Sequence, residues 1–154
     1  MNNVLYYILA VGAGLLIPVQ AATNALLMKA TGNIFYSILI VFFIGLLALI
    51  SLILVVKPEA PAMRDLLNAP IHSFFGGVIV VFYMLTITFI SPKIGMGNSI
   101  LLIIIGQIVS ASIIDHYGSF GFLVSAMSKN KLLGLLCIVV GLAIVTRSGS
   151  NAVV

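Results

Sequence analysis

Of the 154 residues, 62% are apolar and 6% are charged, and the mean hydropathy is +1.33. Soluble domains carry about 25% charged residues, so the composition excludes a soluble globular domain and predicts an all-α integral membrane protein. Seven basic and three acidic residues form no basic patch for nucleic acid, although the net charge is +4. The single Cys137 excludes an intrachain disulfide and a cysteine-based metal cluster.

The first predicted membrane span covers residues 4–27 and contains Pro18. Proline lacks the N–H that would pair with the carbonyl near position 14, so we expect a kink that neighbouring helices or water must satisfy. Gln20 and Asn24 follow on one face of this helix. They are candidates for lining a substrate cavity, and equally for bridging helices through amide hydrogen bonds.

The second predicted span, residues 34–56, is the most apolar. Its second half has Ser51 as the only polar side chain, so lipid can surround most of its surface. A turn at residues 29–33 precedes it, in which Gly32 and Asn33 suit a positive φ.

A polar stretch at residues 57–70 separates the second span from the third, which is predicted at 71–90. We expect a short interfacial helical turn at 63–68 within this stretch. Tyr83 is a polar member of the third span and a candidate cavity residue, although packing with a satisfied hydroxyl explains it more simply. Residues 91–95 include a proline and a glycine and predict a turn.

The fourth predicted span, residues 98–116, carries polar side chains that lipid would penalise. Gln107 and Asp115 are eight residues apart, or about two helical turns, so they lie on one face of the helix. We expect this face to pack against protein. By helical rise Gln107 lies about 14 Å into the membrane, near the midplane where transporter sites concentrate. We therefore count Gln107 and its neighbour Ser110 as candidate cavity residues.

Asp115 is the only acidic residue within any predicted span. An ionisable group inside a membrane is a candidate for proton or charge coupling. Its place at the helix end fits equally well with hydration, with an ion pair to Lys129 or Lys131, or with capping of backbone donors in the following loop.

The fifth predicted span, residues 131–147, is built around the apolar run Leu132–Val145. This run is about 21 Å long at 1.5 Å per residue, which is short of a hydrocarbon core of about 30 Å. Lys131 and Arg147 are therefore expected to extend their charged ends outward.

Three segments carry distinctive motifs: LIPVQAATNA at residues 16–25, SPKIG at 91–95 and GQIVSASIIDHYG at 106–118. They resemble the bacterial YdcZ family of the drug/metabolite transporter superfamily, over nearly the whole chain. The resemblance implies an inner-membrane transporter or exporter of a small organic solute or drug-like compound. It also implies five spans that form half of a ten-helix inverted-repeat transporter, completed as an antiparallel dimer by a second copy or by an oppositely oriented homologue.

The motifs of common enzymes are missing from the sequence. It has no HExxH, no glycine-rich phosphate loop and no Ser-His-Asp order on one membrane face, so we expect no enzyme activity and no cofactor. His72, His116 and Asp115 fall near one interface, but their spacing matches no metal signature. The alternative function is a non-transporting accessory or scaffold membrane protein, whose polar residues only hold helices together.

Residues 1–154 are predicted to form a single five-helix membrane domain, with its two ends on opposite sides of the bilayer. The N-terminal side carries Lys57, Arg64, Lys129 and Lys131, and the opposite side carries Lys29, Lys93 and Arg147. The positive-inside rule places the N-terminus in the cytoplasm by four charges to three, a difference small enough to permit dual topology. A second, inverted copy would cover the polar faces of the first and fourth spans, with Gly134 and Gly141 of the fifth span at the contact.

Cysteine labelling in whole cells tests this topology. Single-cysteine variants Asn2→Cys and Asn151→Cys, in a Cys137→Ala background, should each be labelled partly from outside, because both orientations insert. Labelling of Asn151→Cys alone would establish one fixed orientation and exclude an inverted homodimer.

Overall fold

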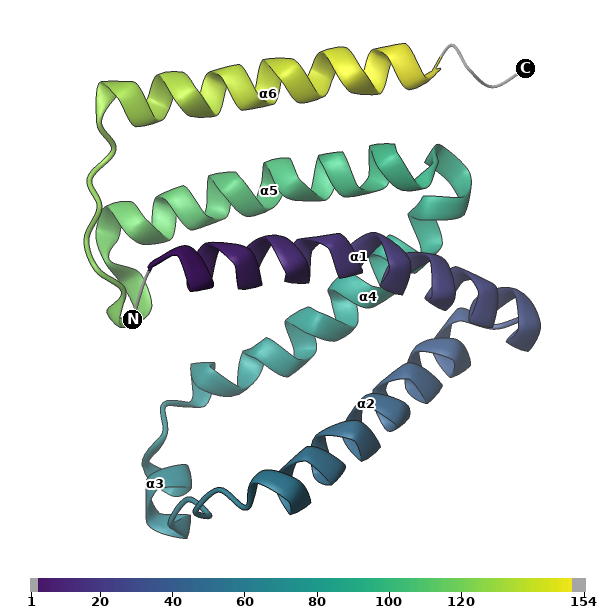
Figure 1. Cartoon of the computed structure of the whole chain (residues 1–154), viewed down its shortest axis with the longest axis vertical. Helices are drawn as coiled ribbons and strands as arrows, with labels where there is room; N and C mark the ends of the chain where they lie inside the picture. Colours follow the sequence, from purple (N-terminus) through teal and green to yellow (C-terminus); the bar gives the residue numbers. More distant parts are fainter. Residues whose placement is uncertain (1–2, 151–154) are drawn as a thin grey trace. The chain divides into compact units, whose positions relative to one another are not determined.

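The computed structural model describes residues 3–150, which leaves the labelling positions Asn2 and Asn151 outside the described part (Figure 1). All regular structure in residues 3–150 is helical. The elements are α1 (Asn3–Thr31), α2 (Ile34–Val56), α3 (Met63–Asn68), η1 (Ile71–Phe74), α4 (Phe75–Ile94), α5 (Met96–Tyr117), η2 (Ser119–Gly121) and α6 (Lys129–Ser150).

Five helices in the described chain are long and apolar enough to cross a membrane. They are α1, α2, η1 continued by α4, α5 and α6, and each overlaps one predicted span. The prediction of an all-α protein with five transmembrane helices is therefore confirmed. Its place as half of a ten-helix inverted repeat stays a prediction.

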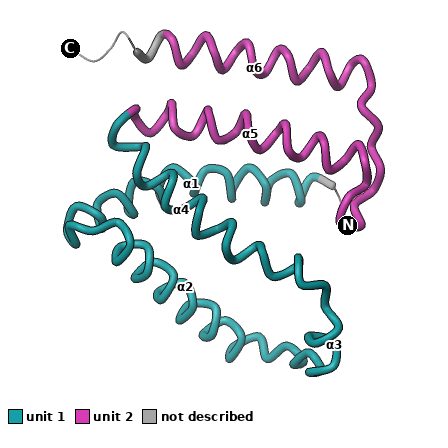
Figure 2. The backbone as a smooth tube through the Cα atoms, turned by 180° about the vertical axis from the view of Figure 1, so that it is seen from behind, with its two compact units in different colours: residues 1–93 teal, residues 94–154 magenta. Residues whose placement is uncertain are grey.

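The chain divides into two compact units, residues 1–93 and residues 94–154 (Figure 2). In unit 1, the backbones of α1 and α2 come close to each other near the link between the two helices (Figure 1). In unit 2, α5 and α6 lie side by side and run in opposite directions (Figures 1 and 2). The prediction of a single domain over residues 1–154 is untested by this division.

α1 extends past its predicted end at residue 27 because its last turn is closed by side chains. The hydroxyl of Thr31 donates to the carbonyl of Leu27 at 2.9 Å, and Gly32, with φ at 65°, ends the helix. Asn33 does not share the expected positive φ: at −145° it caps α2, and its side chain accepts hydrogen bonds from the first backbone N–H groups of that helix. The axis of α1 changes direction partway along (Figures 1 and 2), as expected for a helix that contains Pro18.

The turn predicted at residues 91–95 is wrong for its first four positions, because α4 continues through Pro92 to Ile94. A proline in the last turn removes only the N–H that would pair with the carbonyl of Thr88. Ser91 stays helical, with its hydroxyl donating to the carbonyl four residues earlier at 2.6 Å. Gly95, with φ at 85°, then makes the break before α5.

α3 at Met63–Asn68 confirms the expected short helix, and its position at the membrane interface stays a prediction. The apolar run of the fifth span remains Leu132–Val145, but α6 extends past it at both ends. The helix has 22 residues and is about 33 Å long by helical rise. Its start precedes the apolar run because Ser128 acts as a cap: its hydroxyl accepts a hydrogen bond from the backbone N–H of Lys131 at 3.1 Å.

The connection between α5 and α6 folds back on the end of α5. Gly118 ends α5 with φ at 60°, and the backbone N–H of Ser125 then donates to the carbonyl of Asp115 at 2.8 Å. The N–H of Met127 donates to Nδ1 of His116 at 3.1 Å. These bonds hold the connection in a fixed path to Lys131.

Gly118→Ala should destabilise unit 2 more than Gly121→Ala does. Both glycines have positive φ, which costs an alanine about 1 kcal/mol. A Cβ on Gly118 would also lie 2.6 Å from Cγ2 of Val124, whereas one on Gly121 meets nothing within 4 Å. The midpoints of thermal unfolding in detergent measure the difference, and equal midpoints for the two variants would contradict the packing of this connection.

Candidate functional site

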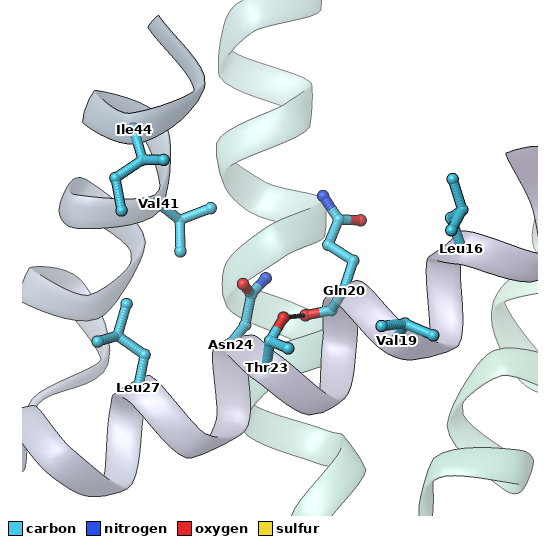
Figure 3. Close-up of a pocket in the computed structure, with 8 residues that line it drawn as sticks. All are labelled: Leu16, Val19, Gln20, Thr23, Asn24, Leu27, Val41 and Ile44. Atoms are coloured by element: carbon cyan, nitrogen blue, oxygen red, sulfur yellow. Dashed lines mark hydrogen bonds between the residues drawn. The ribbon is translucent and has the colours of Figure 1, made fainter. Parts of the chain in front are cut away.

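An open groove of about 460 Å³ lies in unit 1 between α1 and α2 (Figure 3). Its residues come from the second half of α1 and the first half of α2: Leu16, Val19, Gln20, Thr23, Asn24, Leu27, Val41 and Ile44. All the polar side chains among them belong to α1. The groove is therefore apolar on the α2 side and polar on one face of α1.

Close approach of the two helices near their link creates this groove. Gly32 and Asn33 are the only residues between α1 and α2, so the first turns of α2 are held against the last turns of α1. Ala21 of α1 and Ser37 and Ile38 of α2 are buried. Beyond this contact the helices diverge, and the polar face of α1 is left open.

Gln20 and Asn24 project to the same side of α1, as their spacing predicts (Figure 3). Gln20 is exposed, and its side-chain amide makes no hydrogen bond with the residues that the structure describes. Asn24 is 4% exposed, and its Nδ2 lies 3.6 Å from the sulfur of Met84 on α4. The groove thus offers one free amide and one amide already engaged with another helix.

Thr23 belongs to the groove although the sequence analysis did not select it. Its hydroxyl donates to the carbonyl of Gln20 at 2.9 Å, which leaves the hydroxyl oxygen free to accept. The sequence contains a signal for this position: in the motif at residues 16–25, Thr23 adjoins Asn24 and lies three residues after Gln20. This spacing places Thr23 next to Gln20 on the helix surface.

On α4 the partner of Asn24 is Met84, while the predicted Tyr83 is half-buried and lies outside the groove. The buried residues of α4 are Met84, Ile87, Thr88 and Ser91, spaced as one helical stripe. The polar positions of this stripe could have identified the buried face from the sequence. Reasoning from polarity alone selected Tyr83 and missed the methionine beside it.

Gln107 and Ser110, the candidates on α5, are both exposed. Neither side chain hydrogen-bonds to another described residue, whereas the hydroxyl of Ser112 is buried and donates to the carbonyl of Ile108 at 2.7 Å. In a bilayer the amide of Gln107 needs a partner. Within unit 2 no described residue supplies one, so the partner must come from outside the α5–α6 pair.

Asp115 pairs with Lys131, one of the alternatives considered for it. Oδ2 of Asp115 lies 3.1 Å from Nζ of Lys131, and the two side chains are 43% and 29% exposed, respectively. The pair links the end of α5 to the start of α6, and so the carboxylate serves the connection between these helices. Among the described residues, no three His, Cys, Asp or Glu side chains come close enough together to hold a metal ion.

A family model described as "Putative inner membrane exporter, YdcZ" matches residues 5–144 of the chain. The chain belongs to the YdcZ family. No curated protein and no solved structure matches it at a significant level.

Membership of the YdcZ family and the five apolar helices make this a multi-pass membrane protein of a family named for inner-membrane export. The matched range contains every candidate residue, from Gln20 to Asp115. The roles of these residues stay predictions, since family membership does not assign them.

Thr88→Val should stabilise this YdcZ-family protein. The Thr88 hydroxyl is fully buried and, within the described chain, has no hydrogen-bond partner. An unpaired buried hydroxyl costs roughly 1–3 kcal/mol, and valine has nearly the same shape, so we expect a gain of about 1 kcal/mol.

The control is Ser91→Ala, which removes a hydroxyl that is bonded to the carbonyl of Ile87 and should give no gain. Thermal unfolding in detergent compares both variants with the wild type. A loss of stability in Thr88→Val would mean that its hydroxyl has a partner when the protein is assembled.

Proposed function

We propose that the protein moves a small organic solute or drug-like compound across the bacterial inner membrane, acting as an antiparallel dimer. Family membership supports export as the class of activity. The observation that carries the proposal is the groove of unit 1, where an unpaired amide at Gln20 lies beside Asn24 on an otherwise apolar surface. An unpaired amide in a membrane span is costly unless it faces water or a ligand.

The composition of the groove suits a mainly apolar compound with a few polar groups. Five apolar side chains provide contact area, and Gln20, Thr23 and Asn24 supply donors and acceptors. No charged side chain lines it, so a neutral compound, or a cation whose charge lies outside the groove, fits better than an anion. Gln107 and Ser110 offer a second exposed polar face on α5, which we propose also lines the path.

A second copy is part of the proposal because the side-chain amide of Gln107 has no hydrogen-bond partner among the described residues of its own unit. Transporter folds commonly place their binding site between two inverted halves near the midplane. One copy of this chain provides five spans, and an inverted copy would supply the other five. Asp115 is retained as a candidate for coupling, although its contact with Lys131 supports a structural role.

A scaffold protein is the second candidate, and one contact favours it. The amide of Asn24 bridges α1 to Met84 of α4, which is how a polar residue that only joins helices would behave. Gln20, which bridges nothing, distinguishes the two functions.

A thermal-shift screen of a broad compound panel in detergent tests the groove. A compound at 100 times its dissociation constant should stabilise the wild type by about 2.7 kcal/mol and leave Gln20→Ala unshifted. Leu26→Ala, on the exposed face of α1 outside the groove, should respond as the wild type does.

The same compounds should cross the membrane of proteoliposomes that contain the wild type. A shift of equal size in Gln20→Ala would remove the groove from the proposal. A panel in which no compound shifts or crosses would favour the scaffold.

A further inference from the structure

A second groove of unit 1 shares no residue with the first. It has a volume of about 440 Å³ and lies between the start of α2 and the second half of α4. Its lining is Ile34, Phe35, Phe82, Leu85, Thr86 and Phe89. The α4 residues are spaced i, i+3, i+4 and i+7, so they form one face that runs about 10 Å along the helix axis.

A lysine contacts one residue of this groove's lining. Nζ of Lys93 lies 3.5 Å from the ring centroid of Phe89, a cation–π contact that holds the ammonium over a ring of the lining. Lys93 is exposed, and the structure gives it no carboxylate partner among the described residues. An exposed cation, four residues after Phe89 on α4, therefore lies against the lining of the groove.

Both acidic residues of unit 1 lie at one end of α2, whereas basic residues lie at both ends. Lys29 lies just before the start of α2, at the end of the unit that also holds the groove. Glu59 and Asp65, the acidic residues of this unit, follow the other end of α2, a helix of 23 residues that is about 35 Å long. The groove end of unit 1 thus carries positive charge that no acidic residue of the unit balances.

We propose that this groove binds one anionic phospholipid. Its phosphate would pair with the ammonium of Lys93, and the first part of an acyl chain would lie along the Phe82, Leu85 and Phe89 side chains. A lipid supplies both chemistries at the correct spacing, an anion at the level of the head groups and an apolar chain directly beneath it. A helix of an inverted second copy would also bring acidic residues, Glu59 and Asp65, to the level of Lys93. A second copy is therefore the competing occupant that the experiment must distinguish from lipid.

Tryptophan fluorescence in reconstituted vesicles tests the proposal directly. The chain contains no tryptophan, so Phe82→Trp places a single reporter in the groove of the full-length protein. Quenching by phosphatidylglycerol with brominated chains is compared with quenching by brominated phosphatidylcholine at equal mole fraction. One lysine near an anionic lipid gives about a fivefold preference, and we expect that ratio at Phe82→Trp.

Two controls make the outcome specific. In Phe82→Trp combined with Lys93→Gln the preference should fall to near one. Phe43→Trp, on an exposed part of α2 outside the groove, should show no preference with Lys93 present. Should Phe82→Trp misfold, Phe35→Trp provides the reporter, because Phe35 also lines the groove.

Other results overturn the proposal. A preference that survives Lys93→Gln would show that the anion is held elsewhere. A reporter that neither lipid quenches would show that protein, such as a second copy, occupies the groove. Equal quenching by both lipids with Lys93 present would reduce the groove to ordinary lipid-exposed surface.

Discussion

The structure depends on one constraint, that a polar group in the hydrocarbon region must find its partner within protein. Several hydroxyls of the spans meet it locally, by donating to the carbonyl four residues earlier. Six of the described residues do so: Thr31, Ser51, Ser91, Ser99, Ser112 and Thr146. These residues need nothing from the rest of the molecule, and they explain how helices with many serines and threonines remain stable in lipid.

Side-chain amides meet the constraint only in part in this way, because each carries two donors and an acceptor. Nδ2 of Asn98 donates to the carbonyl of Ile94 at 3.0 Å, which uses only one of these groups. Asn24 reaches across to another helix, while Gln20 and Gln107 remain unpaired within the described residues. The polar residues thus separate into those that the helix satisfies and those that need a ligand, water or another molecule. Among the candidate residues, Gln20 and Gln107 are of the second kind, whereas the Thr23 hydroxyl donates to a carbonyl of its own helix.

The sequence predicts the five spans well because apolar run length is a local property. It predicts their ends less well, since Ser128 and Asn33 extend or start helices by capping and Pro92 is tolerated in a last turn. The sequence does not predict contacts between residues that are far apart in the chain. Nothing near Asn24 indicates its contact with Met84, sixty positions away. The choice of Lys131 over Lys129 as the partner of Asp115 likewise depends on the path of the 118–128 connection.

The close backbone contacts join elements that are neighbours along the chain, α1 with α2 and α5 with η2 and α6. Such local contacts close short loops, so each pair can form early and quickly. At roughly 5–20 residues per second, about 3–12 seconds separate the synthesis of Val56 from that of Tyr117, the last residue of α5. The α1–α2 hairpin, with its amide-lined groove, can therefore be complete in the bilayer while the ribosome is still adding α5.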